Sequence, residues 1–179
     1  MMRTMGVLMM ALSVTCFGFL LAEQYRKRQD LLCFLRKMIL FLKNAVLKGN
    51  ETLGAALALV GERFLGEAEK EMQCIPMFFL AAAERLSDED GRMFQEIWEE
   101  ELEKHAGSSV MREEDRGILL QLGRQLGYAD REMQEKTFDL CLDQLEEAIR
   151  LGKEEKRTKM RLFRLLGMAA GSFLVILMI

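Results

Sequence analysis

The segment LRKMILFLKNAVLKGNETLGAALALVGERF, residues 35–64, predicts a helical hairpin that opens an all-α domain. Apolar residues before Gly49 recur at steps of three and four, which places them on one face of a helix: Leu31, Leu35, Met38, Leu42 and Ala45. Gly49 is suited to close this helix. Asn50 or Thr52 is suited to open the next one, because its side-chain oxygen accepts hydrogen bonds from backbone N–H groups.

The segments that follow also predict helices, each bounded by turn or capping residues. Pro76 suits a first helical turn, because its fixed φ fits a helix and its missing donor is not needed there. Ser87 begins SDED, a capping-box pattern that predicts the start of the next helix. Gly127 is predicted to close a helix in the left-handed conformation. Asp130 is then predicted to cap a long final helix.

Helical spacing also predicts which side chains form the core. The tryptophan Trp98 lies on the apolar face of the helix after Ser87, and Leu122 and Leu126 lie on that of the helix before Gly127. The final helix keeps heptad-like spacing through Phe138 and Leu145. The sequence contains no alternating apolar and polar run of the kind that forms a strand.

Both ends of the chain are apolar and predict membrane spans. Residues 5–22, MGVLMMALSVTCFGFLLA, carry no charge, and this length is close to the roughly 20 residues that cross a bilayer. A cleaved signal peptide is the alternative, but Leu20 is too bulky for its cleavage site. Residues 162–179 form a second span in which Arg164, near its start, can extend to the interface.

Basic residues beside these spans predict their orientation. YRKR, residues 25–28, follows the first span, and KEEKRTKMRLFR, residues 153–164, precedes the second. Lys and Arg concentrate on the cytoplasmic side of membrane helices. The alternative is a solvated charge run without topological meaning. The predicted organisation is an anchor at 1–24, a cytoplasmic domain of about six helices at 25–160 and a second transmembrane helix at 161–179.

Composition and the absence of known motifs disfavour nucleic-acid binding, nucleotide hydrolysis and di-iron chemistry. The net charge of −3 disfavours nucleic acid, because such a partner requires a basic surface. The four cysteines are scattered, which fits a reducing compartment. No P-loop motif is present, and the single histidine, His105, has Leu102 three residues before it, so the Glu-x-x-His pair of di-iron bundles is missing. The sequence predicts no catalytic, cofactor-binding or metal-binding residues.

The acidic run EIWEEELEK, residues 96–104, has two interpretations. Its glutamates form either a solvated helix face or a docking patch for a basic partner, with Glu99, Glu100 and Glu103 as candidate contacts. Under the docking interpretation, reversing these three to Lys is predicted to weaken binding and leave the domain folded. Catalysis by these carboxylates is disfavoured, because an exposed helix face does not shift their pKa values as a closed pocket would.

Residues 118–148, ILLQLGRQLGYADREMQEKTFDLCLDQLEEA, resemble the stage III sporulation protein AB family. That family has the pattern L-x-x-[LF]-G-x-x-L-G-x-x-D-[RK] followed by a long helix. The matching positions here are Leu119, Leu122, Gly123, Leu126, Gly127, Asp130 and Arg131. GFLLAEQYRKR, IWEEEL and RLFRLLGMAAGSFLVIL fit in order. This chain departs from the family after Gly49. The family often has a Tyr-Gly-x-Thr-Pro-Leu turn there, whereas this chain reads KGNETL, residues 48–53, and has no proline.

The resemblance implies a mother-cell membrane protein of the complex that joins mother cell and forespore. It further implies a cytoplasmic domain similar to the platform domains of type II secretion and type IV pilus machines. The implied partners are a companion secretion-type ATPase, other membrane components of that complex and lipids, with a homo-oligomer as a further prediction. The functional hypotheses are a non-enzymatic assembly platform, a membrane-tethered adaptor that recruits a soluble protein, and a membrane enzyme with an unrecognised site.

Overall fold

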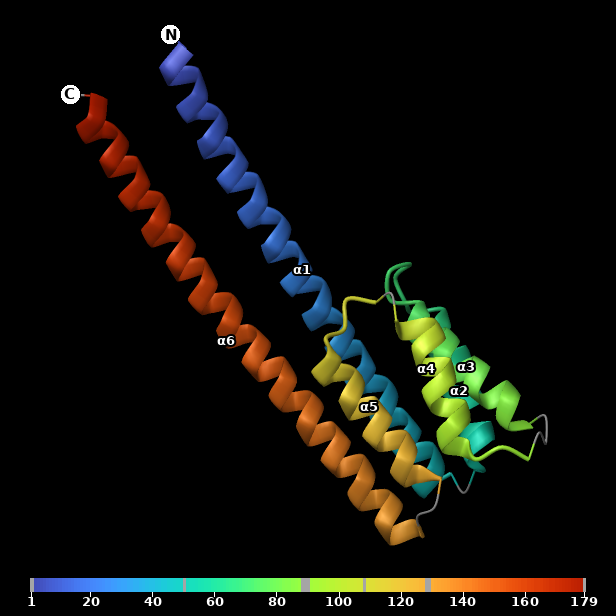
Figure 1. Cartoon of the computed structure of the whole chain (residues 1–179). Helices are drawn as coiled ribbons and strands as arrows, with labels where there is room; N and C mark the ends of the chain where they lie inside the picture. Colours follow the sequence, from blue (N-terminus) through green and yellow to red (C-terminus); the bar gives the residue numbers. More distant parts are fainter. Residues whose placement is uncertain (1, 50, 88–90, 108, 128–129, 179) are drawn as a thin grey trace. The chain divides into compact units, whose positions relative to one another are not determined.

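The computed structural model describes residues 2–49, 51–87, 91–107, 109–127 and 130–178, with side chains described only between residues 23 and 158. These residues form six helices and no strand, so the all-α prediction is confirmed for them (Figure 1). The helices are α1 (Met2–Leu47), α2 (Leu53–Leu65), α3 (Cys74–Ser87), α4 (Phe94–Ala106), α5 (Glu113–Leu126) and α6 (Arg131–Met178).

The chain divides into two compact units. One contains residues 30–149, and the other contains residues 1–29 together with 150–179. The helix α1 has 46 residues and α6 has 48, and each passes from one unit into the other without a break. The helix that begins the central domain is therefore continuous with the N-terminal apolar segment.

A membrane-spanning helix is not found within the described residues. None of the helices there is long and apolar enough to cross a membrane. The predicted spans, residues 5–22 and 162–179, lie outside the residues whose side chains are described.

Short polar side chains open two of the helices. The Oγ1 atom of Thr52 accepts a hydrogen bond from the Ala55 N–H at 3.3 Å, which starts α2. An oxygen of Asp130 accepts one from the Met133 N–H at 2.8 Å, which starts α6. At the end of α1, the Gly49 N–H donates to the Asn44 carbonyl at 3.2 Å. This bond closes α1, and the segment that follows lacks the proline that is common in the family that this chain resembles.

The prediction that Ser87 opens a helix is wrong. Ser87 is the last residue of α3, and its hydroxyl donates to the Ala83 carbonyl one turn back at 3.0 Å. Ser and Thr hydroxyls compete for such carbonyls, and here this local bond keeps Ser87 within the preceding helix. The next helix begins later, at Phe94 after the N-cap residue Met93, and between the two helices Gly91 has φ 67°.

The prediction that Gly127 takes a left-handed conformation is also wrong. Its φ is −70° and its ψ −20°, so it stays in the right-handed helical region. A Cβ at this position would lie 3.4 Å from the Cβ of Phe94, which is ordinary contact. Gly127 therefore ends α5 without needing the conformational freedom of glycine.

Trp98 lies at the centre of the core, as its spacing predicts. Its side chain is fully buried, and its ring centroid is 4.5 Å from that of Phe78 and 5.4 Å from that of Phe94. The indole N–H donates to the Leu119 carbonyl at 2.8 Å, so one side chain ties α3, α4 and α5 together. Leu122 and Leu126 are buried beside it in the same core.

Glycine sets how closely two pairs of helices approach. A Cβ on Gly123 would overlap the indole ring of Trp98, so α5 meets α4 at a position that only glycine allows. A Cβ on Gly61 would lie 2.5 Å from the Leu80 side chain, which brings α2 close to α3. At both positions an added side chain would require neighbouring atoms to shift, and at Gly123 those atoms belong to the fully buried Trp98.

Candidate interaction surface

The glutamates predicted as partner contacts lie on α4, and each of them bridges to another part of the chain. Their side chains differ in exposure, from 36% for Glu99 through 47% for Glu100 to 77% for Glu103. The bridges join Glu99 to Arg124 of α5 at 2.8 Å, Glu100 to Arg85 of α3 at 2.8 Å and Glu103 to Arg116 of α5 at 2.5 Å. The glutamates on this face of α4 therefore form ion pairs with α3 and α5 of the same chain.

This arrangement changes what a charge reversal would test. Lys at the three positions would lie beside Arg85, Arg116 and Arg124, and like charges at such distances are repulsive. The prediction that the triple reversal leaves the domain folded therefore loses its physical basis, and the triple variant does not separate binding from folding.

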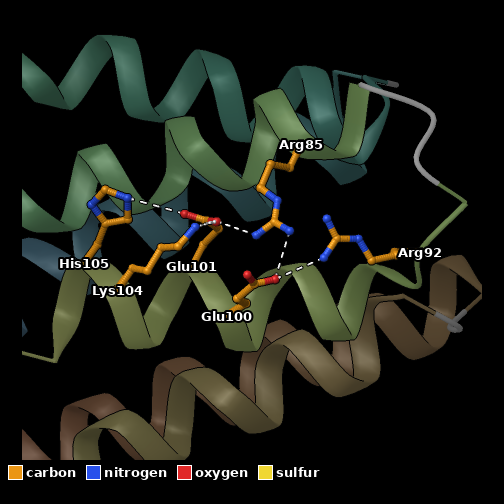
Figure 2. Close-up of polar contacts among 6 residues, drawn as sticks. All are labelled: Arg85, Arg92, Glu100, Glu101, Lys104 and His105. Atoms are coloured by element: carbon orange, nitrogen blue, oxygen red, sulfur yellow. Dashed lines mark hydrogen bonds and ion pairs between the residues drawn. The ribbon is translucent and has the colours of Figure 1, made fainter.

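A fourth glutamate, Glu101, lies in the interior and is surrounded by cations (Figure 2). Its side chain is 3% exposed. One carboxylate oxygen accepts from Arg85 at 2.5 Å and from Lys104 at 2.9 Å, and the other lies 3.4 Å from Nε2 of His105. Arg85 also pairs with Glu100, which pairs in turn with Arg92 at 3.2 Å.

The cluster has a clear electrostatic consequence. Burial opposes ionisation of Glu101, but the hydrogen bonds from Lys104 and Arg85 outweigh it, so its pKa lies below the usual value. The hydrogen bond from Arg85 likewise lowers the pKa of Glu100, and that same bond raises the pKa of Arg85. Both carboxylates are therefore charged at neutral pH, and they fix the end of α3 against α4.

Sequence reasoning missed two buried carboxylates that periodicity alone would have shown. Glu101 comes three residues after Trp98 and four after Ile97, which are both on the apolar face of α4. Asp115 is also fully buried, and it accepts a hydrogen bond from the Arg112 N–H at 2.9 Å as an N-terminal cap of α5. An acidic residue at an apolar position of a helix is the signal for an internal charge partner.

Metal-binding groups and reactive thiols are two further kinds of site that the described residues could form. No group of three or more His, Cys, Asp and Glu side chains among them could hold a metal ion. Burial raises the pKa of the Cys141 thiol to about 12 and also raises the pKa of Cys74. Both cysteines are therefore protonated at neutral pH and poor nucleophiles.

A groove lies between the start of α2 and the end of α3. It has a volume of about 740 Å³ and combines apolar side chains, such as Leu53, Leu80 and Leu86, with the polar residues Thr52, Glu84 and Ser87. On the α2 side, the small residues Gly54, Ala55 and Ala58 line the groove together with Leu53. The groove is open to solvent and presents both apolar and polar side chains.

These features define a helical bundle whose first and last helices extend beyond its core and whose charged side chains mainly link its own helices. The chain belongs to the stage III sporulation protein AB family, whose model matches residues 3–179. Its role is therefore in sporulation.

The chain is also similar to a curated protein and to a solved structure. Stage III sporulation protein AB of Bacillus subtilis (strain 168) is 24% identical over 178 residues, which cover 99% of each chain. A solved structure of a stage III sporulation protein AB has a TM-score of 0.64 at 20% identity, and the match covers 74% of this chain and 98% of that one. The second likeness supports the fold.

Proposed function

We propose that this protein is a non-enzymatic, membrane-anchored assembly platform in a sporulation complex that links mother cell and forespore. The observation that carries the proposal is the continuity of α1 and α6. Each helix leaves the core of residues 30–149 and passes through a basic segment into an uncharged or nearly uncharged apolar run at an end of the chain. A domain held through two such helices is suited to a fixed position at a membrane surface.

The proposed topology places the central domain in the cytoplasm of the mother cell. Basic residues lie between the domain and each apolar run, at residues 25–28 and 153–164. Because Lys and Arg favour the cytoplasmic side, both runs would cross the membrane away from the domain. Both transmembrane segments belong to this proposal.

The proposed soluble partner is the companion secretion-type ATPase of the complex. The chain has no P-loop of its own, so energy for a secretion-like process would come from another protein. Of the predicted contacts on α4, Glu103 is the one most available to such a partner, since its side chain remains 77% exposed despite its pair with Arg116. Exposed charge of this kind acts mainly on association rate and orientation.

Isolation of the tagged full chain from sporulating cells in mild detergent tests the proposal. We expect both the ATPase and other membrane components of the complex to co-isolate, with the ATPase released progressively as salt screens the contact. Recovery of the ATPase without any membrane component would favour the adaptor hypothesis. Absence of both at low salt would refute the platform.

A further inference from the structure

We propose that the groove between α2 and α3 binds a basic amphipathic helix of a protein of the sporulation complex. This inference rests on the proposed function and adds the surface and the chemistry of the partner. The groove lies between Thr52 and Ala58 on α2 and between Leu80 and Ser87 on α3. It is therefore separate from the glutamates of α4.

The walls of the groove favour an apolar helix face. Leu53, Leu80 and Leu86 are partly buried, so that each presents part of its apolar surface. A helix that lays an apolar stripe into such a groove removes this surface from water, and this is a common mode of peptide recognition.

The charge at the groove favours a basic occupant. The side chain of Glu84 is exposed and has no hydrogen bond or ion pair with any residue that the structure describes, unlike those of Glu99, Glu100 and Glu103. The groove adjoins the N-terminus of α2 and the C-terminus of α3, whose partial charges have opposite signs. The carboxylate of Glu84 therefore makes the net charge at the groove negative.

Two further carboxylates extend this preference beyond the groove. Glu51 precedes Thr52 and Glu62 lies one turn after Ala58; both are exposed, and neither has an ionic partner within the described part of the chain. A Lys or Arg beside the apolar stripe of the occupant would pair with Glu84, and basic residues farther along would meet these two.

Photo-crosslinking in sporulating cells tests the site in the full chain. A photoreactive amino acid in place of Ala55, an exposed groove residue, is expected to give an adduct, and mass spectrometry of the joined peptide identifies its occupant. We expect that peptide to come from a protein of the complex and to combine Lys or Arg with apolar residues at helical spacing. Glu84→Lys should lower the adduct yield about fivefold or more.

Asp143→Lys is the matched control. Asp143 is exposed on α6 and, like Glu84, has no partner among the residues described, so the substitution makes the same change in net charge on another helix. The adduct yield should not change. No adduct, an adduct with lipid or with a second copy of this chain, or one insensitive to Glu84→Lys would overturn the proposal.

The outcomes also separate this site from the proposed function. An adduct with a basic helix of a protein other than the ATPase would support the groove and show that the ATPase binds elsewhere. If the ATPase and membrane components co-isolate but Ala55 gives no adduct, the groove is overturned and the platform stands.

Discussion

Replacement of Gly123 by Ala should lower the free energy of unfolding of the central domain, residues 25–160, by about 3 kcal/mol. The added Cβ would overlap the Trp98 indole, which cannot withdraw because it contacts Phe78, Phe79 and Phe94 and its N–H is bound to the Leu119 carbonyl. The strain should exceed the gain of about 1 kcal/mol that Ala brings to a helix interior. Denaturant unfolding followed by circular dichroism measures the change.

Gly117→Ala provides a matched control in the same helix. Gly117 is exposed within α5, and nothing lies within 4 Å of the position of a Cβ there. The same substitution should therefore stabilise the domain by about 0.5–1 kcal/mol. Equal effects at Gly117 and Gly123 would contradict the close approach of α4 and α5.

Removal of the Trp98 side chain should have a similarly large effect. Trp98→Ala is expected to cost about 3–5 kcal/mol, because it leaves a cavity among Phe78, Phe79 and Phe94 and leaves the Leu119 carbonyl without this donor. Trp98→Phe keeps most of the apolar volume and should cost distinctly less. An unchanged denaturation midpoint for Trp98→Ala would show that this core assignment is wrong.

The sequence was sufficient to predict the helical class and the place of Trp98, because a period near 3.6 residues extends over whole helices and follows directly from burial. The role of Gly123 could not be predicted in the same way. Its conformation is ordinary, and only the approach of Trp98 from another helix makes a Cβ impossible there. The sequence pattern of the family includes a glycine at the position of Gly123, but the pattern does not explain why a glycine is needed there.

Local signals were least reliable at the helix ends. Ser87 had the right neighbours for a cap, yet its hydroxyl bonded to the carbonyl of Ala83. For α4, the prediction treated its glutamates as one face, whereas Glu101 points into the core and Glu99, Glu100 and Glu103 bridge to arginines. The two arginines on α5, Arg116 and Arg124, are 13 and 25 residues away in sequence from the glutamates that they contact. Spacing within α4 could therefore not reveal these ion pairs.

We propose that both ends of the chain are anchored in the membrane and that the domain between them is cytoplasmic. A reporter active only in the cytoplasm tests it most directly, inserted beside Gly107 at the end of α4 or fused after Ile179. We expect activity at Gly107 and none after Ile179. Activity after Ile179 together with silence at Gly107, or release of a soluble domain that begins near Glu23, would contradict the account.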